Sequence, residues 1–154
     1  MAERRWVFVI RSCDRPGALT ATASAFSNRG VSLEGVLGSG IDSSTAEDAR
    51  IILSFQATEA KQITLRRVVE RLANVLQIDV YAYDDPGLRA IAIARLPPDR
   101  PLPVDDAIQL EVMSQQPNHT TVLLTGGTLA IEALLQTLRQ QQGLLDVVMT
   151  AIAI

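Results

Sequence analysis

Residues 13–19 have the composition of a turn that could bind a small zwitterion. Their sequence is Cys-Asp-Arg-Pro-Gly-Ala-Leu, and they follow the apolar run of residues 6–10. If a strand passes into a helix here, with Pro16 as the first helical residue, unpaired backbone N–H groups are left to donate to a carboxylate. Gly17 has no side chain to obstruct a ligand, and Asp14 offers a negative charge to an ammonium group. The segment could therefore hold both charged groups of a free amino acid.

The other reactive side chains do not form a catalytic set. Cys13 is the only cysteine and His119 the only histidine, which excludes an intrachain disulfide, a multi-cysteine metal site and a catalytic triad. The glycine pairs at 38–40 and 126–127 lack the lysine and the spacing of nucleotide-binding loops. We therefore expect no catalytic residue, no metal and no cofactor in this chain, which favours a binding protein over an enzyme.

The composition is that of a compact globular protein with a slightly acidic balance. Of the 154 residues, 47% are hydrophobic and 20% charged, and the formal net charge is −3. No run of Lys or Arg exceeds two residues, so neither nucleic acid nor an anionic membrane is an expected partner. The apolar run near the N-terminus is too short for a signal peptide or a membrane span. We expect a cytoplasmic protein, in agreement with the single cysteine.

Hydrophobic periodicity in the first half predicts the order strand, helix, strand, strand, helix, strand. A polar loop at 39–46 joins the two middle strands, and the carboxylates of Asp42, Glu47 and Asp48 are expected at its tip. This order is the ferredoxin-like βαββαβ plan of the α+β class, in which two helices cover one face of a four-stranded antiparallel sheet. The expected strands are 5–11, 31–38, 51–57 and 78–82, and the helices begin at Pro16 and at a Thr58 cap.

Both predicted helices of the first half carry an apolar stripe. The first helix ends at Asn28-Arg29-Gly30, where glycine suits a left-handed C-cap. The stripes consist of Leu19, Ala23 and Phe26 in the first helix, and of Leu65, Val68, Val69, Leu72 and Leu76 in the second.

The second half predicts a degenerate ferredoxin-like unit that lacks its first helix. The turn signal at residues 84–87 marks the boundary, so we expect one domain at 1–84 and a second at 85–154. Four prolines within residues 97–103 exclude a regular helix there. An extra helical turn at 104–110 remains an open alternative. The expected elements are strands at 88–96, 108–113, 120–125 and 144–154, and a helix that Thr128 caps and Gly143 ends.

Two motifs of the first half, together with the two-unit plan, resemble a known family. The turn Asp-Arg-Pro-Gly-Ala-Leu at 14–19 and the segment Phe-Ser-Asn-Arg-Gly-Val-Ser-Leu-Glu at 26–34 are similar to the start of an ACT domain. More narrowly, they resemble the small regulatory subunit of acetolactate (acetohydroxyacid) synthase. In that family a Pro-Gly-Ala-Leu turn precedes a Phe-Ser-x-Arg-Gly helix end and a hydrophobic-Glu pair. Residues 123–127 and the helix at 131–139 resemble its C-terminal domain.

The resemblance implies a non-catalytic partner of a large, thiamine-diphosphate-dependent subunit. Such a partner raises the activity of the large subunit and transmits feedback inhibition by a branched-chain amino acid, usually valine. The family's ligand lies at a dimer interface between ACT domains. Asparagine is usual in the family at the positions of Asp14 and Ser32, so this chain departs from the pattern twice. The ligand-binding positions carried over to this sequence are Asp14, Arg15, Pro16, Gly17, Ala18, Leu19 and Ser32.

Two other functional hypotheses follow from the same residues. The second hypothesis, after the regulatory subunit, is a free-standing ACT-domain amino-acid sensor without an acetolactate synthase partner, which the departures at Asp14 and Ser32 favour. The third hypothesis is a purely structural assembly module. Each hypothesis includes a homodimer, because a single ferredoxin-like unit exposes sheet edges that need cover. First-unit sheets would pair edge to edge, or helices would pack between protomers.

Overall fold

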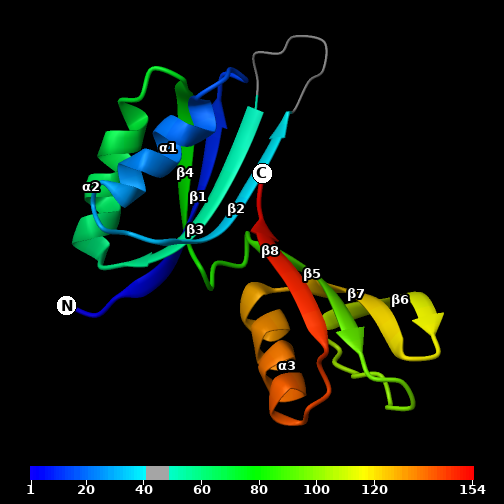
Figure 1. The fold of residues 1–154 in the computed structure, drawn as a ribbon. Helices are drawn as coiled ribbons and strands as arrows, with labels where there is room; N and C mark the ends of the chain where they lie inside the picture. The colour runs from blue at the N-terminus through cyan, green and yellow to red at the C-terminus, as the bar shows by residue number, and fades with distance from the viewer. Residues whose placement is uncertain (41–48) are drawn as a thin grey trace. The chain divides into compact units, whose positions relative to one another are not determined.

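The computed structural model describes residues 1–40 and 49–154, which form two compact units, Met1–Asp85 and Pro86–Ala153. Each unit contains one four-stranded antiparallel sheet, and helices cover one face of it (Figure 1). The α+β, ferredoxin-like prediction is confirmed for both units. The predicted carboxylate tip with Asp42, Glu47 and Asp48 lies outside the described residues.

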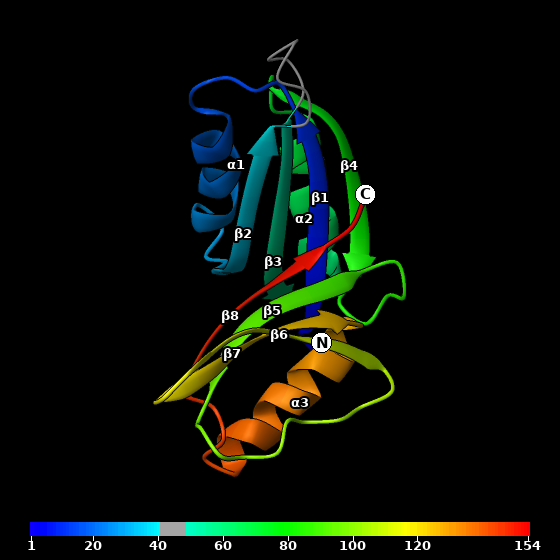
Figure 2. The ribbon, with the colours of Figure 1, turned by 90° about the vertical axis from the view of Figure 1, so that its right-hand side faces the viewer.

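The first unit has the predicted βαββαβ order. Its strands lie in the order β2-β3-β1-β4, so β1 and β3 are central while β2 and β4 form the edges. Figure 2 shows α1 and α2 side by side on the same face of this sheet. The elements are β1 (Arg4–Ser12), α1 (Ala18–Ser27), β2 (Leu33–Gly40), β3 (Ala49–Ala57), α2 (Glu59–Glu70) and β4 (Val75–Ala82).

Three phenylalanines form the centre of the first core. Phe8 of β1, Phe26 of α1 and Phe55 of β3 are all 0% exposed. Their ring centroids are 4.8–5.8 Å apart in edge-to-face arrangements, which aromatic rings prefer over a parallel sandwich. Alternate residues of β1 and β3 face this core, so the residues between them lie on the helix-free face of the sheet.

The stripe predicted for α1 was displaced by one position. The buried residues are Ala18, Thr22, Ala25 and Phe26, whereas Leu19 is 45% exposed. Phe26 is fixed in the core, and the residues four and eight positions before it are Thr22 and Ala18. Thr22 is a polar residue, so a search for an apolar stripe does not include it. Its hydroxyl donates to the Ala18 carbonyl at 2.9 Å, which satisfies the hydroxyl in the buried position.

The predicted features of α2 are mostly confirmed. Thr58 is its N-cap, and the Thr58 side chain accepts from the Lys61 N–H. Leu65 and Val69 are buried in the predicted stripe. Leu76 was wrongly included: α2 ends at Glu70, and Leu76 is a β4 residue that is 61% exposed.

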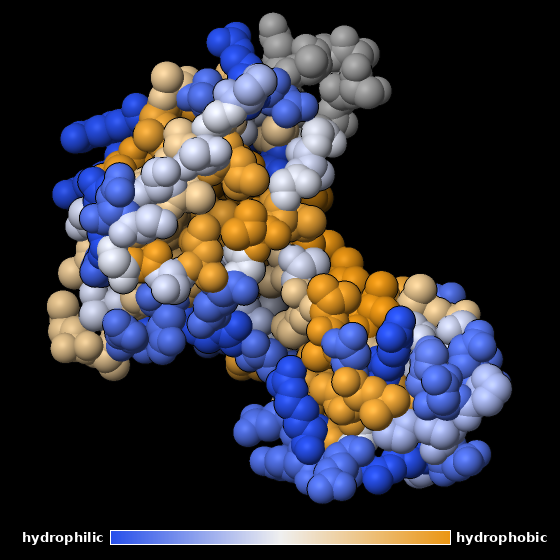
Figure 3. All heavy atoms as spheres, viewed as in Figure 1, coloured by the Kyte–Doolittle hydropathy of each residue, from blue (hydrophilic) through white to orange (hydrophobic). Residues whose placement is uncertain are grey.

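The second unit repeats the sheet topology of the first without the first helix. Its strand order β6-β7-β5-β8 corresponds strand by strand to that of the first unit. Figure 3 shows apolar side chains gathered along β8, the strand that carries the exposed Val148. The elements are β5 (Arg89–Leu96), β6 (Ile108–Gln116), β7 (His119–Gly126), α3 (Thr128–Gln140) and β8 (Asp146–Ile152).

The link between β5 and β6 contains no helix, so the alternative of a helical turn at 104–110 is wrong. Only a short turn precedes β6, closed by bonds from Ile108 N–H and Ala107 N–H to Asp105. Thr128 was also misassigned: Gly127 is the N-cap of α3, while Thr128 is its first helical residue and is 3% exposed.

The C-terminal end of α3 places a glutamine in a conformation that suits glycine. The Gly143 N–H donates to the Leu138 carbonyl at 2.7 Å, which is the 6→1 hydrogen bond of a Schellman motif. The residue in the left-handed region is Gln142, with φ 52°, rather than the predicted Gly143. The last helical residue is Gln140, and Gln141 is the C-cap, so the helix ends before the predicted Gly143.

We expect Gln142→Gly to raise the free energy of unfolding by about 0.5–1 kcal/mol, because glycine adopts positive φ without steric cost. Urea denaturation measures the change. Gln141→Gly is the matched control, because Gln141 has φ −88° and gains nothing from glycine. Equal effects of the two substitutions would contradict the interpretation.

Candidate functional site

The segment between β1 and α1 forms a tight turn at one end of the first unit. The Cys13 N–H donates to the Asn74 carbonyl at 2.8 Å, which ties the end of β1 to the segment before β4. The Ala18 N–H then donates to the Arg15 carbonyl at 3.2 Å and closes a four-residue turn. Gly17 has φ 86° and ψ −10°, the values of the third residue of a type II turn.

This geometry corrects the predicted helix start. Pro16 was expected as the first helical residue, but α1 begins at Ala18 and its N-cap is Gly17. Pro16 instead occupies the second position of the type II turn, where its fixed φ is favourable. Gly17 distinguishes the two structures. A type II turn requires positive φ at the residue after the proline, whereas a helix with Pro16 as its first residue does not require positive φ at residue 17.

The turn leaves donors at the start of α1. Gly17 provides no side-chain cap, and the first helical bond runs from the Ala21 N–H to the Gly17 carbonyl. Within the described residues, the N–H groups of Leu19 and Thr20 have no backbone partner. A Cβ built on Gly17 meets no atom within 4 Å, so no neighbouring group fills the space beside this glycine. Such free N–H groups at a helix start are suited to a carboxylate.

The structure brings six of the seven predicted positions together. Asp14, Arg15, Pro16, Gly17 and Leu19 are exposed, whereas Ala18 is buried at 7% and anchors the start of α1. The Asp14 carboxylate lies near the end of β2, because a Cβ built on Gly40 would lie 3.5 Å from its Oδ2 atom. The turn therefore lies beside the last residue of the edge strand β2.

Ser32 is the predicted position that the structure does not bring to the turn. It is exposed and directly precedes Leu33, the first residue of β2. The turn precedes α1, Ser32 follows it, and the ten residues of α1 span about 15 Å. Figure 1 shows the start and the end of α1 at opposite ends of the first unit. Within one chain, Ser32 and the turn cannot contact the same small ligand.

Ser12 is a polar residue of this region that sequence reasoning missed. It is 1% exposed and faces the helices, and its hydroxyl has no hydrogen-bond partner among the described residues. A serine at the end of an apolar strand gives no sequence signal, because its burial depends on how the strand packs under α1. The buried hydroxyl belongs to the last residue of β1, directly before the turn segment in the sequence.

The second unit has a separate shallow hollow on the helix-free face of its sheet. Its volume is about 480 Å³, and its polar lining includes Arg89, Gln109 and Thr125. No sequence motif pointed to it, because its lining residues come from strands that are far apart in the chain.

No helix among the described residues is long and apolar enough to cross a membrane.

We expect Gly17→Ala to lower the free energy of unfolding by about 1–2 kcal/mol, because a Cβ is unfavourable in the left-handed region. Chemical denaturation measures the loss. Gly38→Ala is the matched control: its Cβ also meets no atom within 4 Å, but Gly38 does not have positive φ. A loss of equal size at Gly38 would show that the cost does not arise from the turn.

The comparisons with known proteins agree with this arrangement. No protein-family model matches the chain. The acetolactate synthase small subunit of Mycobacterium bovis is 28% identical over 130 residues, which cover 81% of this chain and 76% of that protein. The crystal structure of the acetolactate synthase small subunit from Thermotoga maritima matches with a TM-score of 0.69 at 15% identity, covering 97% of this chain and 96% of that one. The chain thus resembles the ACT-domain small subunit of acetolactate synthase in sequence and in fold.

Proposed function

We propose that this chain is the regulatory, non-catalytic subunit of an acetolactate synthase. It raises the activity of a large, thiamine-diphosphate-dependent subunit and transmits feedback inhibition by a branched-chain amino acid, valine or a close analogue. The observation that carries the proposal is the 28% identity to the mycobacterial small subunit over 81% of the chain. The open donors of the β1–α1 turn supply a physical basis for effector binding. In this proposal residues 1–84 are an ACT domain and residues 85–154 an ACT-like domain.

The effector site is proposed to combine two chains. Since Ser32 lies at the far end of α1 from Gly17, the second wall of the site comes from a homodimer. The strand β2 is at the edge of its sheet and is therefore available to pair with a second copy. In an antiparallel β2 pair, the start of one strand lies beside the end of the other. Ser32 of the partner subunit then lies next to Gly40, and hence near Asp14.

The charges of this composite site fit an amino acid. The N–H groups of Leu19 and Thr20 receive the carboxylate, while the Asp14 carboxylate receives the ammonium group. Ala18 and Gly17 supply a wall without bulky groups, and the exposed Leu19 side chain offers apolar contact to a branched side chain. The family asparagine would accept as well as donate at the position of Asp14, whereas a carboxylate only accepts. The Asp14 side chain can therefore bind the ammonium group of the ligand but not its carboxylate.

The test of the regulatory role is reconstitution. The purified chain is mixed with the acetolactate synthase large subunit of the same organism, and complex formation and acetolactate production are measured with and without valine. We expect binding, a higher rate with the chain present, and a lower rate when valine is added. Absence of both binding and stimulation would exclude the regulatory role.

A free-standing amino-acid sensor is the second candidate, and Asp14 is the observation that favours it. Its carboxylate beside Gly40 departs from the family pattern and still provides an ammonium partner. Calorimetry with the twenty amino acids and no large subunit tests this role. Heat or a melting shift with one of them, combined with no response of the large subunit, supports the sensor. No response to any of them excludes it.

We expect Gly17→Asp to abolish the response to valine, because the new carboxylate lies beside the bound carboxylate and repels it. Titration calorimetry of the homodimer measures the loss. Gly17→Asn is the matched control, since Asn and Asp have similar shapes and both tolerate positive φ. We expect the asparagine variant to retain binding, and equal loss in both variants would attribute the effect to shape.

A further inference from the structure

The hollow on the helix-free face of the second sheet has a cation without a partner at its edge. The hollow lies at the end of the sheet where β5 begins, and every residue that lines it belongs to the second unit. Arg89 is exposed, and its guanidinium has no hydrogen-bond or ion-pair partner among the residues that the structure describes. Its neighbour Ala90 belongs to the helix-side core, so the Arg89 side chain projects from the opposite face. The volume of about 480 Å³ is within the range of about 300–1,000 Å³ that is typical of small-molecule sites.

No carboxylate of the described residues lines this hollow beside Arg89. The acidic residue of β6 on this face, Glu111, lies in the cross-strand row of Ile93. Ile93 is four residues along β5 from Arg89, a distance of about 13 Å at the rise of a strand. In the segment before β6, the Asp105 Oδ1 atom accepts the Ala107 N–H at 2.8 Å and is engaged in closing a turn. The lining of the hollow is therefore electropositive.

A hydrogen bond orients the polar side chains on the opposite side of the hollow. Thr125 of β7 and Gln109 of β6 are direct cross-strand partners, and the Thr125 hydroxyl donates to the Gln109 Oε1 atom at 3.4 Å. Because the amide oxygen accepts this bond, the NH₂ group of Gln109 is left to donate to a ligand. Gly126 shapes the adjoining wall. A Cβ there would lie 2.9 Å from the Ala107 carbonyl oxygen, so the glycine allows the segment before β6 to approach β7 closely.

We propose that this hollow binds a small aliphatic carboxylate. The Arg89 guanidinium and the Gln109 amide supply N–H donors to the two carboxylate oxygens, and a guanidinium suits a carboxylate because it can bind both oxygens at once. Two strand spacings and two residues separate Arg89 from Gln109, which places their backbones about 12 Å apart. The two long side chains together cover that distance, so one carboxylate can receive bonds from both.

The rest of the lining suits a short hydrocarbon chain and not a zwitterion. Ile91 and Ile152 provide an apolar surface beside the donors. A free amino acid is disfavoured, because its ammonium group would lie near Arg89 with no carboxylate in the lining. The hollow therefore differs in ligand chemistry from the proposed effector turn, and the proposal does not depend on the regulatory role.

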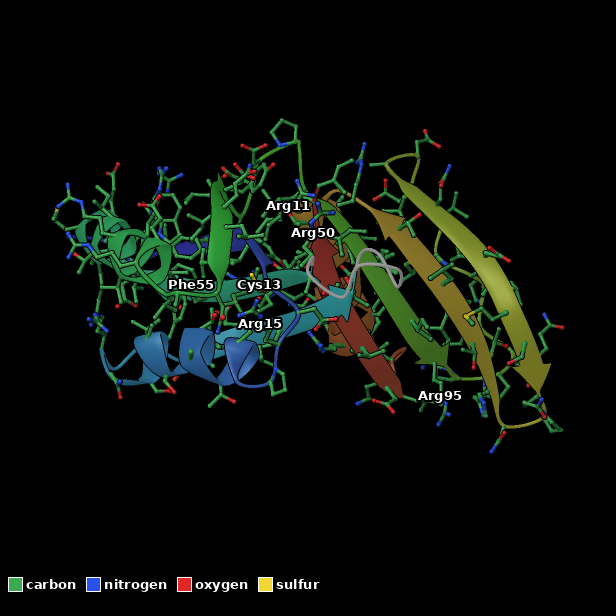
Figure 4. All side chains as sticks on the ribbon, turned by 90° about the horizontal axis from the view of Figure 1, so that it is seen from above. Arg11, Cys13, Arg15, Arg50, Phe55 and Arg95 are labelled. Atoms are coloured by element: carbon green, nitrogen blue, oxygen red, sulfur yellow. The ribbon has the colours of Figure 1, made fainter. Side chains whose placement is uncertain are left out.

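Arg95 provides a matched control on the same strand and the same face. It lies six residues after Arg89, about 20 Å away, and does not line the hollow. Figure 4 shows Arg95 beside the arrowhead of β5, the end opposite to Arg89. Its cross-strand partner on β8 is Asp146, so a carboxylate flanks Arg95. Arg95→Gln thus removes the same charge from the chain as Arg89→Gln without altering the hollow.

The test is titration calorimetry of the full chain with sodium isovalerate (3-methylbutanoate). The comparison ligands are acetate, isoamyl alcohol and inorganic phosphate, which offer the carboxylate alone, the hydrocarbon chain alone and an oxyanion without a chain. We expect isovalerate to bind about tenfold more tightly than any of them, because it alone meets both the donors and the apolar surface. In Arg89→Gln we expect the affinity for isovalerate to fall by about tenfold or more, since a charge-assisted bond is lost. Arg95→Gln should retain the affinity.

A second readout locates the bound isovalerate and separates this site from the effector turn. In NMR spectra we expect isovalerate to shift the backbone signals of Thr125 and Gly126 and the Arg89 Nε–H signal. Gly17→Asp should bind isovalerate with unchanged affinity, because that substitution alters only the turn of the first unit. Absence of isovalerate binding, equally tight binding of phosphate, an unchanged affinity in Arg89→Gln, or a loss of binding in Gly17→Asp would overturn the proposal. Reconstitution with the large subunit tests the regulatory role separately, so the failure of either proposal is recognisable by itself.

Discussion

The packing of Phe26 against Phe8 and Phe55 is the contact on which the rest of the first unit depends. It joins α1 to the two central strands, with all three rings fully enclosed. Once Phe26 is fixed, the helix period places Thr22 and Ala18 against the sheet and turns Leu19 outward. The start of α1 is thereby held where β1 ends, and only a tight turn can connect them. The positive φ of Gly17 is required by this tight turn.

The fold could be predicted largely from the sequence because its elements have strong periodicity and clear breakers. The alternation of β3 and the stripe of α2 follow from burial on one side, and the four prolines of the 97–103 segment exclude a helix. The errors arose where local propensity and tertiary packing disagree. Pro16 is compatible with both a helix start and a type II turn, and a buried Thr22 does not count as apolar. Gln142 in the left-handed region has no sequence signature at all.

The candidate site was predictable only where it is local in sequence. The turn at 13–19 is one continuous segment, so its composition describes it. The separation of Ser32 from Gly17 depends on the direction in which α1 runs, and the grouping of Arg89 with Gln109 depends on strand register. A one-residue slip in register would move either side chain to the core face. Such juxtapositions are properties of the assembled sheet, and no motif in one strand contains them.

The distance that α1 imposes between Gly17 and Ser32 also governs how ligand binding and assembly are linked. In the effector site proposed above, a small molecule that touches both residues bridges two chains, so it would bind the dimer and have no complete site on the monomer. By mass action, the apparent affinity then rises with protein concentration, and saturating ligand lowers the dissociation constant of the dimer. A two-fold pair contains two such sites in identical surroundings, so the first molecule bound strengthens the assembly that the second molecule requires. In that proposal, the length of one helix makes the concentration of the chain itself a regulatory variable.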